Sequence, residues 1–297
     1  MNNKEVISLS VEIPQRGKII MEEKIYLVDL SFLSRGEGEI PFSGPHLMDS
    51  IRKAIMSSDP IMARSTELNE ISVHPFMPKD GWRAWCRYQG MHVSNGERLQ
   101  SKVVIFSEEV FNVVRSWLLK RPSIRVGEIN FLLGDVSWTE LNYSSFIIKE
   151  PSKSFRLVFM TPTCLKRSEP QLCYLYPNMR TIVSSLASIW NRKAETKCPD
   201  PRTMGTWASL SLIETGYELC TSRPIQLQGN RYLVGFVGWV NYRVADHPEW
   251  SREDHNMMSA WAQTLLRLGE LSGVGIARSI GFGKIRYSAS RSGAHFL

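Results

Sequence analysis

Apolar and polar residues alternate with a period of two along several segments of this chain, which is the pattern of half-buried strands. These segments are residues 24–33, 70–76, 82–88, 98–106 and 124–140. Between them, apolar residues recur every three or four positions over 46–56 and 108–119, which predicts two helices. The resulting order of strands and helices is that of the split βαβ plan, in which two helices cover one face of an antiparallel sheet.

The second half of the chain repeats this order. Strands are predicted at 155–161, 210–219, 232–244 and 284–288, and helices at 179–190 and 252–271. A polar, proline-containing stretch at 150–153 marks the joint between the halves. The sequence therefore predicts an α+β protein of two tandem ferredoxin-like domains, the plan also used by RNA-recognition domains. Residues 1–150 would form the first domain and residues 151–297 the second.

Composition narrows the classes of function that fit. The chain has 36 Lys plus Arg against 29 Asp plus Glu, a formal charge of +7, which weakly favours a polyanionic partner such as nucleic acid. The five cysteines are far apart and form no CxxC pair, so neither disulfides nor a metal site is predicted, and a reducing cytoplasm fits best. No signal peptide is apparent, and the longest apolar run is far shorter than the about 20 residues that span a bilayer. We expect a cytoplasmic protein without membrane contact.

A glycine-rich, basic loop at 273–284 joins the last predicted helix to the last predicted strand. The loop contains four glycines, Gly273, Gly275, Gly281 and Gly283. Because glycine has no side chain, the backbone can come close to a ligand at these positions. Successive amide groups can converge there on phosphate oxygens, and Arg278 and Lys284 add positive charge. The spacing is not that of a P-loop, and a loop that follows a helix reverses the order of a dinucleotide fingerprint. Taken alone, the loop is equally well explained as a helix cap at Gly273 followed by a turn.

Several motifs together resemble one family, the CRISPR-associated repeat-processing endoribonucleases. The loop is similar to the family's signature, in which paired glycines and a basic residue precede Gly-Phe-Gly. Other segments resemble family motifs in the same order along the chain: Ile40–Phe42 with Ser58–Pro60, Val73–Phe76, Phe159–Thr163, Pro177 with the following helix, and Gly235–Gly238. The resemblance implies two ferredoxin-like domains and contact of the loop with RNA phosphates.

The resemblance also implies a reaction, cleavage of precursor transcripts within each CRISPR repeat. The 2′-hydroxyl beside the scissile bond attacks the phosphate without a metal ion and leaves 2′,3′-cyclic phosphate and 5′-hydroxyl ends. Such a reaction needs a base, an acid and positive charge near the phosphate. No metal or cofactor is expected.

The residues for this chemistry are expected in the first domain, where the sequence departs from the family. Many members have a histidine in or just after the first helix, but here those places fall near Met48 and Glu67. The nearest histidines are His46, at the helix start, and His74, on the following strand, and each also fits a hydrogen-bonded or surface residue.

Basic residues are the other candidates for the chemistry. Some relatives use lysine and arginine in place of histidine, which makes Arg52 and Lys53 candidates, together with Lys79. Since Arg52 and Lys53 are adjacent and cannot share one helix face, at most one of them is expected to face the substrate.

Further basic residues of the second half suit RNA binding better than chemistry. They are Lys166, Arg167, Arg223 and Arg231. The expected partner is CRISPR repeat RNA; other subunits of an effector complex and a second copy of the chain remain open as partners. Because the usual histidine is missing, a non-catalytic RNA-binding subunit of such a complex is the alternative function.

Overall fold

The first half of the chain forms a five-stranded antiparallel sheet covered by helices. The computed structural model describes residues 24–65, 70–87, 90–166, 173–227 and 231–290. The strands of the first sheet are β1 (Lys24–Arg35), β3 (Ile71–His74), β5 (Arg98–Ile105), β6 (Ser123–Val126) and β7 (Ile129–Asn142). Their order is β3-β5-β1-β7-β6, and every neighbouring pair is antiparallel. Helices α1 (Gly44–Ser58) and α3 (Glu108–Leu118) lie on one face, and α2 (Pro60–Ser65) follows α1.

Successive side chains of β1 point to opposite faces of the first sheet, and both faces are buried. Tyr26 and Val28 are buried in a core shared with α1 and α3, whereas Ile25, which points to the opposite face, belongs to the core of the second half. Val104 and Phe106 join Ile25 in that second core. The two halves therefore share buried apolar surface.

The second half forms a four-stranded sheet with the same topology. Its strands are β8 (Ser154–Thr163), β11 (Leu212–Thr221), β14 (Phe236–Val244) and β15 (Ile285–Ala289), and its helices are α4 (Met179–Lys193), α5 (Pro201–Ser211) and α6 (Arg252–Ser272). The order is β11-β14-β8-β15. In each half the fourth strand of the plan lies beside the first and the third beside the second, which confirms the predicted ferredoxin-like fold. Among the helices of the described residues, none is long and apolar enough to cross a membrane.

Some predicted elements differ from the structure. The strand predicted at 82–88 is absent from its described residues, 82–87: the short helix η2 (Gly81–Cys86) occupies this place, and its Trp85 is buried against the second half. The predicted strand at 124–140 is the hairpin of β6 and β7, and the one at 232–244 is divided into β13 (Tyr232–Leu233) and β14. The start of the strand predicted from Leu210 is the last turn of α5.

Two disulfides contradict the prediction of unpaired cysteines. Cys86 of η2 is bonded to Cys220 of β11, with a Cα–Cα distance of 6.3 Å, and Cys164 at the end of β8 is bonded to Cys173, with a Cα–Cα distance of 5.6 Å. Cys198 is free and buried. The fold brings these sulfur atoms together from distant or loop-separated positions, which spacing along the chain does not reveal.

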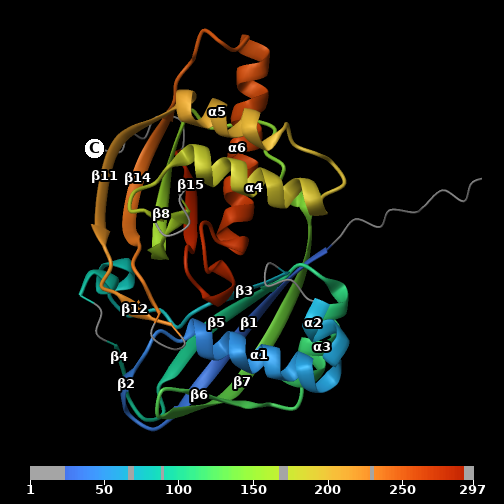
Figure 1. The fold of residues 1–297 in the computed structure, drawn as a ribbon, viewed down its shortest axis with the longest axis vertical. Helices are drawn as coiled ribbons and strands as arrows, with labels where there is room; N and C mark the ends of the chain where they lie inside the picture. The colour runs from blue at the N-terminus through green and yellow to red at the C-terminus, as the bar shows by residue number, and fades with distance from the viewer. Residues whose placement is uncertain (1–23, 66–69, 88–89, 167–172, 228–230, 291–297) are drawn as a thin grey trace, which may run out of the picture.

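Figure 1 shows the two halves stacked end to end, with the glycine-rich loop where they meet. The loop contains the short helix η4 (Arg278–Ile280), which contacts β3 and α1 of the first half. The fold therefore carries the C-terminal loop to the N-terminal domain that holds the predicted chemistry.

Candidate functional site

The glycine-rich loop is shaped by close backbone contacts at two of its glycines. Gly273 caps α6 with φ 72°, as the helix-cap interpretation predicted. Gly275 has φ 80°, and a Cβ atom there would collide with the carbonyl oxygen of Cys164. The next amide, of Ile276, donates to that same oxygen at 2.9 Å. The loop is thus held tightly against the end of β8.

Hydrogen bonds inside the protein use many of the loop's amides, contrary to the predicted cradle of successive amides around a phosphate. The amides that donate to protein acceptors are those of Gly273, Val274, Ile276, Ile280, Gly281, Phe282, Gly283 and Lys284. Gly273, Gly281 and Gly283 are also buried. These glycines shape the loop, and their contact with RNA stays a prediction.

Lys284 is buried, which contradicts the expectation that it contacts RNA. Its side chain is 2% exposed, and its Nζ atom donates to the Ser72 hydroxyl of β3. The Ser72 Oγ atom in turn lies 2.9 Å from the Ser272 carbonyl oxygen at the end of α6. Burial lowers the pKa of Lys284 well below its ordinary value, and the charge of Arg278 adds to this. Lys284 links the loop to the first sheet.

His74 is half-buried in the same interface. Its Nε2 atom is buried and has no hydrogen-bond partner among the described residues. Burial lowers the pKa of His74 well below its ordinary value, and the charges of Lys284 and Lys102 add to the shift. The catalytic role of His74 stays a prediction.

A pocket of about 280 Å³ opens where α1, the glycine-rich loop and a small hairpin meet. The hairpin is formed by β12 (Ile225–Gln226) and β13. The lining residues are Pro45, Met48, Asp49, Arg52, Leu227, Arg231, Ala277, Ser279 and Ile280. Arg52 and Arg231, predicted separately from the two halves, are brought into one pocket by the fold.

The polar groups of this pocket come from three separate segments. Arg52 and Arg231 are exposed, so their guanidinium groups are open to a ligand. Asp49 also lines the pocket and pairs with Lys53, whose Nζ atom lies 2.7 Å from its carboxylate. Of the adjacent pair on α1, Arg52 lines the pocket and Lys53 does not. The sequence reasoning missed Asp49 and Ser279, although Asp49 stands three residues before Arg52 and so faces the same side of a helix.

His46 lies near the start of α1 but is not among the residues that line the pocket. It is half-buried, and burial lowers the pKa of its imidazole, while the Asp49 carboxylate acts in the opposite direction. The imidazole is therefore neutral at pH 7 and can accept a proton. Lys79 is paired with Glu97 at 3.1 Å, away from this pocket.

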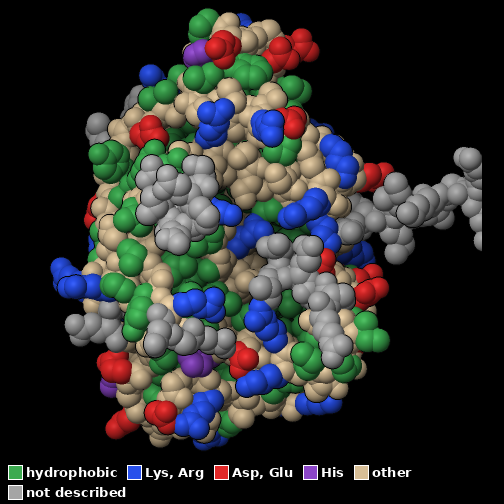
Figure 2. Space-filling view, viewed as in Figure 1, with side chains coloured by type: hydrophobic (Ala, Val, Ile, Leu, Met, Phe, Trp, Pro, Cys, Tyr) green, Lys and Arg blue, Asp and Glu red, His purple; other side chains and the backbone are tan. Residues whose placement is uncertain are grey.

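The other residues predicted to bind RNA are spread along the junction. Lys166 and Arg223 are exposed, and Arg167 lies outside the described residues. Arg278 is half-buried, and burial together with Arg192 lowers its pKa. Figure 2 shows lysine and arginine side chains gathered across the middle of one face, where the two halves meet. Positive charge gathered in this way attracts a polyanion.

Comparison with known proteins agrees with the predicted resemblance. Residues 157–285 match the family model described as CRISPR-associated endoribonuclease Cas6. The CRISPR-associated endoribonuclease Cas6 of Mycobacterium tuberculosis is 27% identical over 141 residues, which are 48% of this chain and 41% of that protein. The aligned region thus spans well under two thirds of the length of this relative.

Solved structures share the fold over nearly the whole chain. A Cas6 product complex has a TM-score of 0.64 at 20% identity and covers 89% of this chain and 100% of its own. Thermus thermophilus Cas6 has a TM-score of 0.61 at 16% identity, with coverage of 90% and 99%. The family model and the Cas6 relative bear out the resemblance, and these structures show that the shared fold extends beyond the segment that the family model matches.

Proposed function

We propose that this chain is an endoribonuclease that binds CRISPR repeat RNA and cleaves the precursor transcript within each repeat. The observation that supports this most directly is the meeting of Arg52, Arg231 and Ser279 in one pocket, beside the loop that carries the family signature. The related proteins are described as CRISPR-associated endoribonucleases, and one similar structure is a Cas6 substrate mimic complex. RNA cleavage suits a pocket that is lined by two guanidinium groups, of Arg52 and Arg231, and by the carboxylate of Asp49.

The pocket offers groups for metal-independent cleavage by the RNA's own 2′-hydroxyl. Arg52 and Arg231 can donate hydrogen bonds to the non-bridging oxygens of the scissile phosphate and stabilise the charge that grows in the transition state. Asp49 is a proton acceptor for the attacking 2′-hydroxyl, and neutral His46, three residues earlier on α1, is a second one. The products are a 2′,3′-cyclic phosphate and a 5′-hydroxyl.

A non-catalytic RNA-binding subunit of a CRISPR effector complex is the alternative. One observation favours it: among the described residues that line the pocket there is no histidine. Arginine side chains hold phosphate but do not exchange protons near neutral pH, so a pocket of this kind can bind RNA without cutting it.

Cleavage of a labelled repeat RNA in the presence of EDTA tests the proposal, with Arg52→Ala and Lys53→Ala as a matched pair of variants. We expect the wild-type protein to make one cut that leaves a cyclic phosphate. Arg52→Ala should lower the single-turnover rate by about 100-fold, because a donor to the transition state is lost. Lys53→Ala removes a solvent-exposed charge outside the pocket that pairs with Asp49, and because an exposed ion pair is weak it should change the rate only a few-fold.

Two results would contradict the proposal. Tight binding of the repeat by the wild-type protein without a cut supports the RNA-binding subunit. An equal loss of rate in both variants shows that the reaction depends on overall charge and not on the pocket. Circular dichroism of both variants establishes that each is folded.

A further inference from the structure

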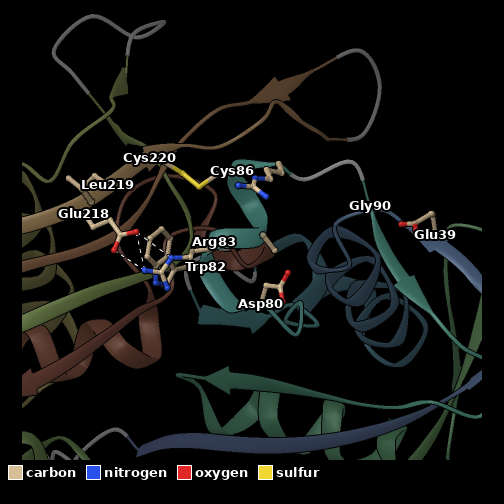
Figure 3. Close-up of a pocket in the computed structure, with 11 residues that line it drawn as sticks. Glu39, Asp80, Trp82, Arg83, Cys86, Gly90, Glu218, Leu219 and Cys220 are labelled. Carbon is tan, nitrogen blue, oxygen red and sulfur yellow. Dashed lines mark hydrogen bonds and ion pairs between the residues drawn. A yellow bond between two sulfur atoms is a disulfide. The ribbon is translucent and has the colours of Figure 1, made fainter.

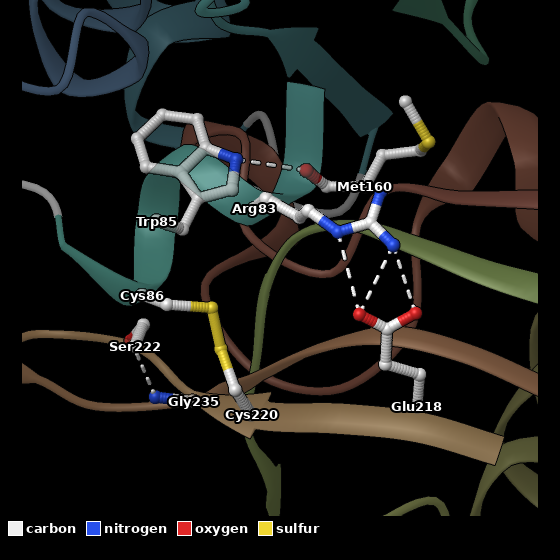
Figure 4. Close-up of a disulfide and its surroundings, with 8 residues drawn as sticks. All are labelled: Arg83, Trp85, Cys86, Met160, Glu218, Cys220, Ser222 and Gly235. Atoms are coloured by element: carbon white, nitrogen blue, oxygen red, sulfur yellow. Dashed lines mark hydrogen bonds and ion pairs between the residues drawn. A yellow bond between two sulfur atoms is a disulfide. The ribbon is translucent and has the colours of Figure 1, made fainter. Parts of the chain in front are cut away.

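The short helix η2 of the first half is docked on the second sheet by polar contacts (Figure 4). Arg83 donates to both carboxylate oxygens of Glu218 on β11, at 3.0 and 2.8 Å. Trp85, which is 1% exposed, donates its indole N–H to the Met160 carbonyl oxygen at 2.8 Å. These contacts hold η2 in place whether or not its cysteine is bonded.

The Cys86–Cys220 disulfide crosses this docked interface and joins residues that are 134 positions apart. Both cysteines are half-buried and line an open cavity of about 1040 Å³ (Figure 3). A cavity of this size admits a molecule as large as a tripeptide. The sulfur atoms of the bridge are therefore within reach of a small reagent from solvent.

Charged side chains of both signs line the same cavity. Arg83 and Arg87 follow one another closely along η2 and its end, next to Cys86, and cationic neighbours favour the thiolate form of a cysteine. Arg83 and Glu218 form an ion pair and neutralise each other, which leaves the charge of Arg87 next to Cys86. The remaining acids are Asp80, before η2, and Glu39, which lies at the opposite end of the cavity from the bridge in Figure 3.

We propose that Cys86–Cys220 is a thiol–disulfide exchange site for a low-molecular-weight thiol, and that exchange there makes and breaks the covalent link between η2 and β11. The thiolate of the small thiol attacks one cysteine sulfur and forms a mixed disulfide, while the cysteine–cysteine bond breaks and the other cysteine leaves as a thiolate. A second small thiol attacks the mixed disulfide and releases the oxidised dimer of the reagent. Two small thiols thus supply the two electrons, and both cysteines end as thiols.

The Cys164–Cys173 disulfide serves as a control within the same chain, because one of its cysteines is buried. Cys164 is 1% exposed, and its carbonyl oxygen accepts the amide of Ile276 from the glycine-rich loop that covers it. Thiol–disulfide exchange requires direct access to a sulfur atom along the bond. Cys173, the partner of Cys164, is half-buried, so one sulfur atom of this bridge is shielded, whereas both cysteines of the other bridge line the open cavity. A small thiol should therefore open Cys86–Cys220 before Cys164–Cys173.

Opening of the Cys86–Cys220 disulfide would affect the hairpin that carries Arg231 into the proposed RNA pocket. This consequence rests on the proposed function. Cys220 lies two residues before Ser222, whose amide donates to the Gly235 carbonyl oxygen at 2.7 Å, and the hairpin between these two residues carries Arg231. The disulfide therefore fixes the base of that hairpin to η2. After reduction the contacts of Arg83 and Trp85 keep the two thiols close enough to be oxidised again.

Peptide mass spectrometry of the full chain tests the exchange site without any RNA. The oxidised protein is treated with reduced glutathione for increasing times and then alkylated. We expect glutathione adducts or alkylated thiols at Cys86 and Cys220 at least 10-fold sooner than at Cys164 and Cys173. The variants Cys220→Ser and Cys173→Ser should each remove one bridge and leave the other.

Either of two results would overturn the proposal: no linked Cys86–Cys220 peptide in the oxidised protein, or opening of Cys164–Cys173 as early as Cys86–Cys220. An exchange site that behaves as expected in a chain that does not cut repeat RNA would refute the proposed function alone, since the mass measurement is independent of cleavage.

Discussion

At the scale of single residues, the buried Lys284 is the side chain whose environment is least expected. It is a lysine without a carboxylate partner among the described residues, and its ammonium form is disfavoured by burial and by Arg278. The groups that face it are Ser72, His74 and Arg278. None of these supplies negative charge, so the folded protein favours the neutral amine.

This environment predicts a pH dependence of stability. The pKa of Lys284 is well below 10.5 in the folded protein and has its ordinary value in the unfolded chain. At a pH between the folded and the unfolded pKa, Lys284 is therefore protonated in the unfolded chain and neutral in the folded protein. The free energy of unfolding should therefore rise with pH in that window, by up to about 1.4 kcal/mol per pH unit. Lys284→Met should lose this rise when urea unfolding is measured from neutral pH upward. An identical slope in wild type and variant would mean that Lys284 stays charged when folded.

The sequence predicted part of the pocket at this scale. Arg52 and Arg231 were singled out by charge and place in the chain, and the fold brings them together. Lys284 was assigned to the surface because it follows a glycine-rich signature, whereas its burial depends on Ser72, more than 200 residues away. No local pattern carries that information. Helical spacing places Asp49 on the same side of α1 as Arg52, so its position could have been predicted. Its i,i+4 pair with Lys53, however, is also typical of a solvent-exposed helix face.

At the scale of elements, the glycine-rich loop depends on backbone shape more than on exposed amides. Gly275→Ala should destabilise the protein by more than the usual cost of positive φ, since the new Cβ would meet the Cys164 carbonyl oxygen. Gly96→Ala is the matched control: Gly96 has φ 78°, and nothing lies within 4 Å of the place of its Cβ. We expect a loss of about 1–2 kcal/mol for Gly96→Ala and a clearly larger one for Gly275→Ala in urea unfolding.

Equal losses in these two variants would contradict a tight fit of the loop against β8. Repeat binding gives a second measurement, because only the Gly275 variant alters the loop that borders the pocket. The Gly96 variant should bind repeat RNA as the wild type does.

Long periodic elements were predictable, and short ones were not. The strand β1 and the helix α6 follow from the periodicity of their apolar residues, and the cap of α6 from Ser251, whose side chain accepts the Asp254 amide. The helix η2 was predicted as a strand because six residues fit either period. Its true shape follows from tertiary contacts of Trp85 with the other half, which a local window does not contain.

At the scale of the whole molecule, the connections between the two halves include the shared core around Ile25, the Ser72–Lys284 contact, and the docked helix η2. Trp85 is central to the last of these, since it is fully buried and stacks edge-on against Phe42, which in turn contacts Phe282 of the glycine-rich loop. The halves should therefore unfold as one cooperative unit.

Trp85→Ala tests this coupling. Removal of a buried indole and of its hydrogen bond to Met160 should lower the free energy of unfolding by about 3–5 kcal/mol. Because the cavity would lie between the halves, the single unfolding transition should also separate into two. Trp138→Ala is the control: this tryptophan of β7 is 39% exposed, and its loss should cost less than about 1.5 kcal/mol and leave one transition. Comparable effects of the two substitutions, measured by circular dichroism in urea under reducing conditions, would show that the docking of η2 does not hold the halves together.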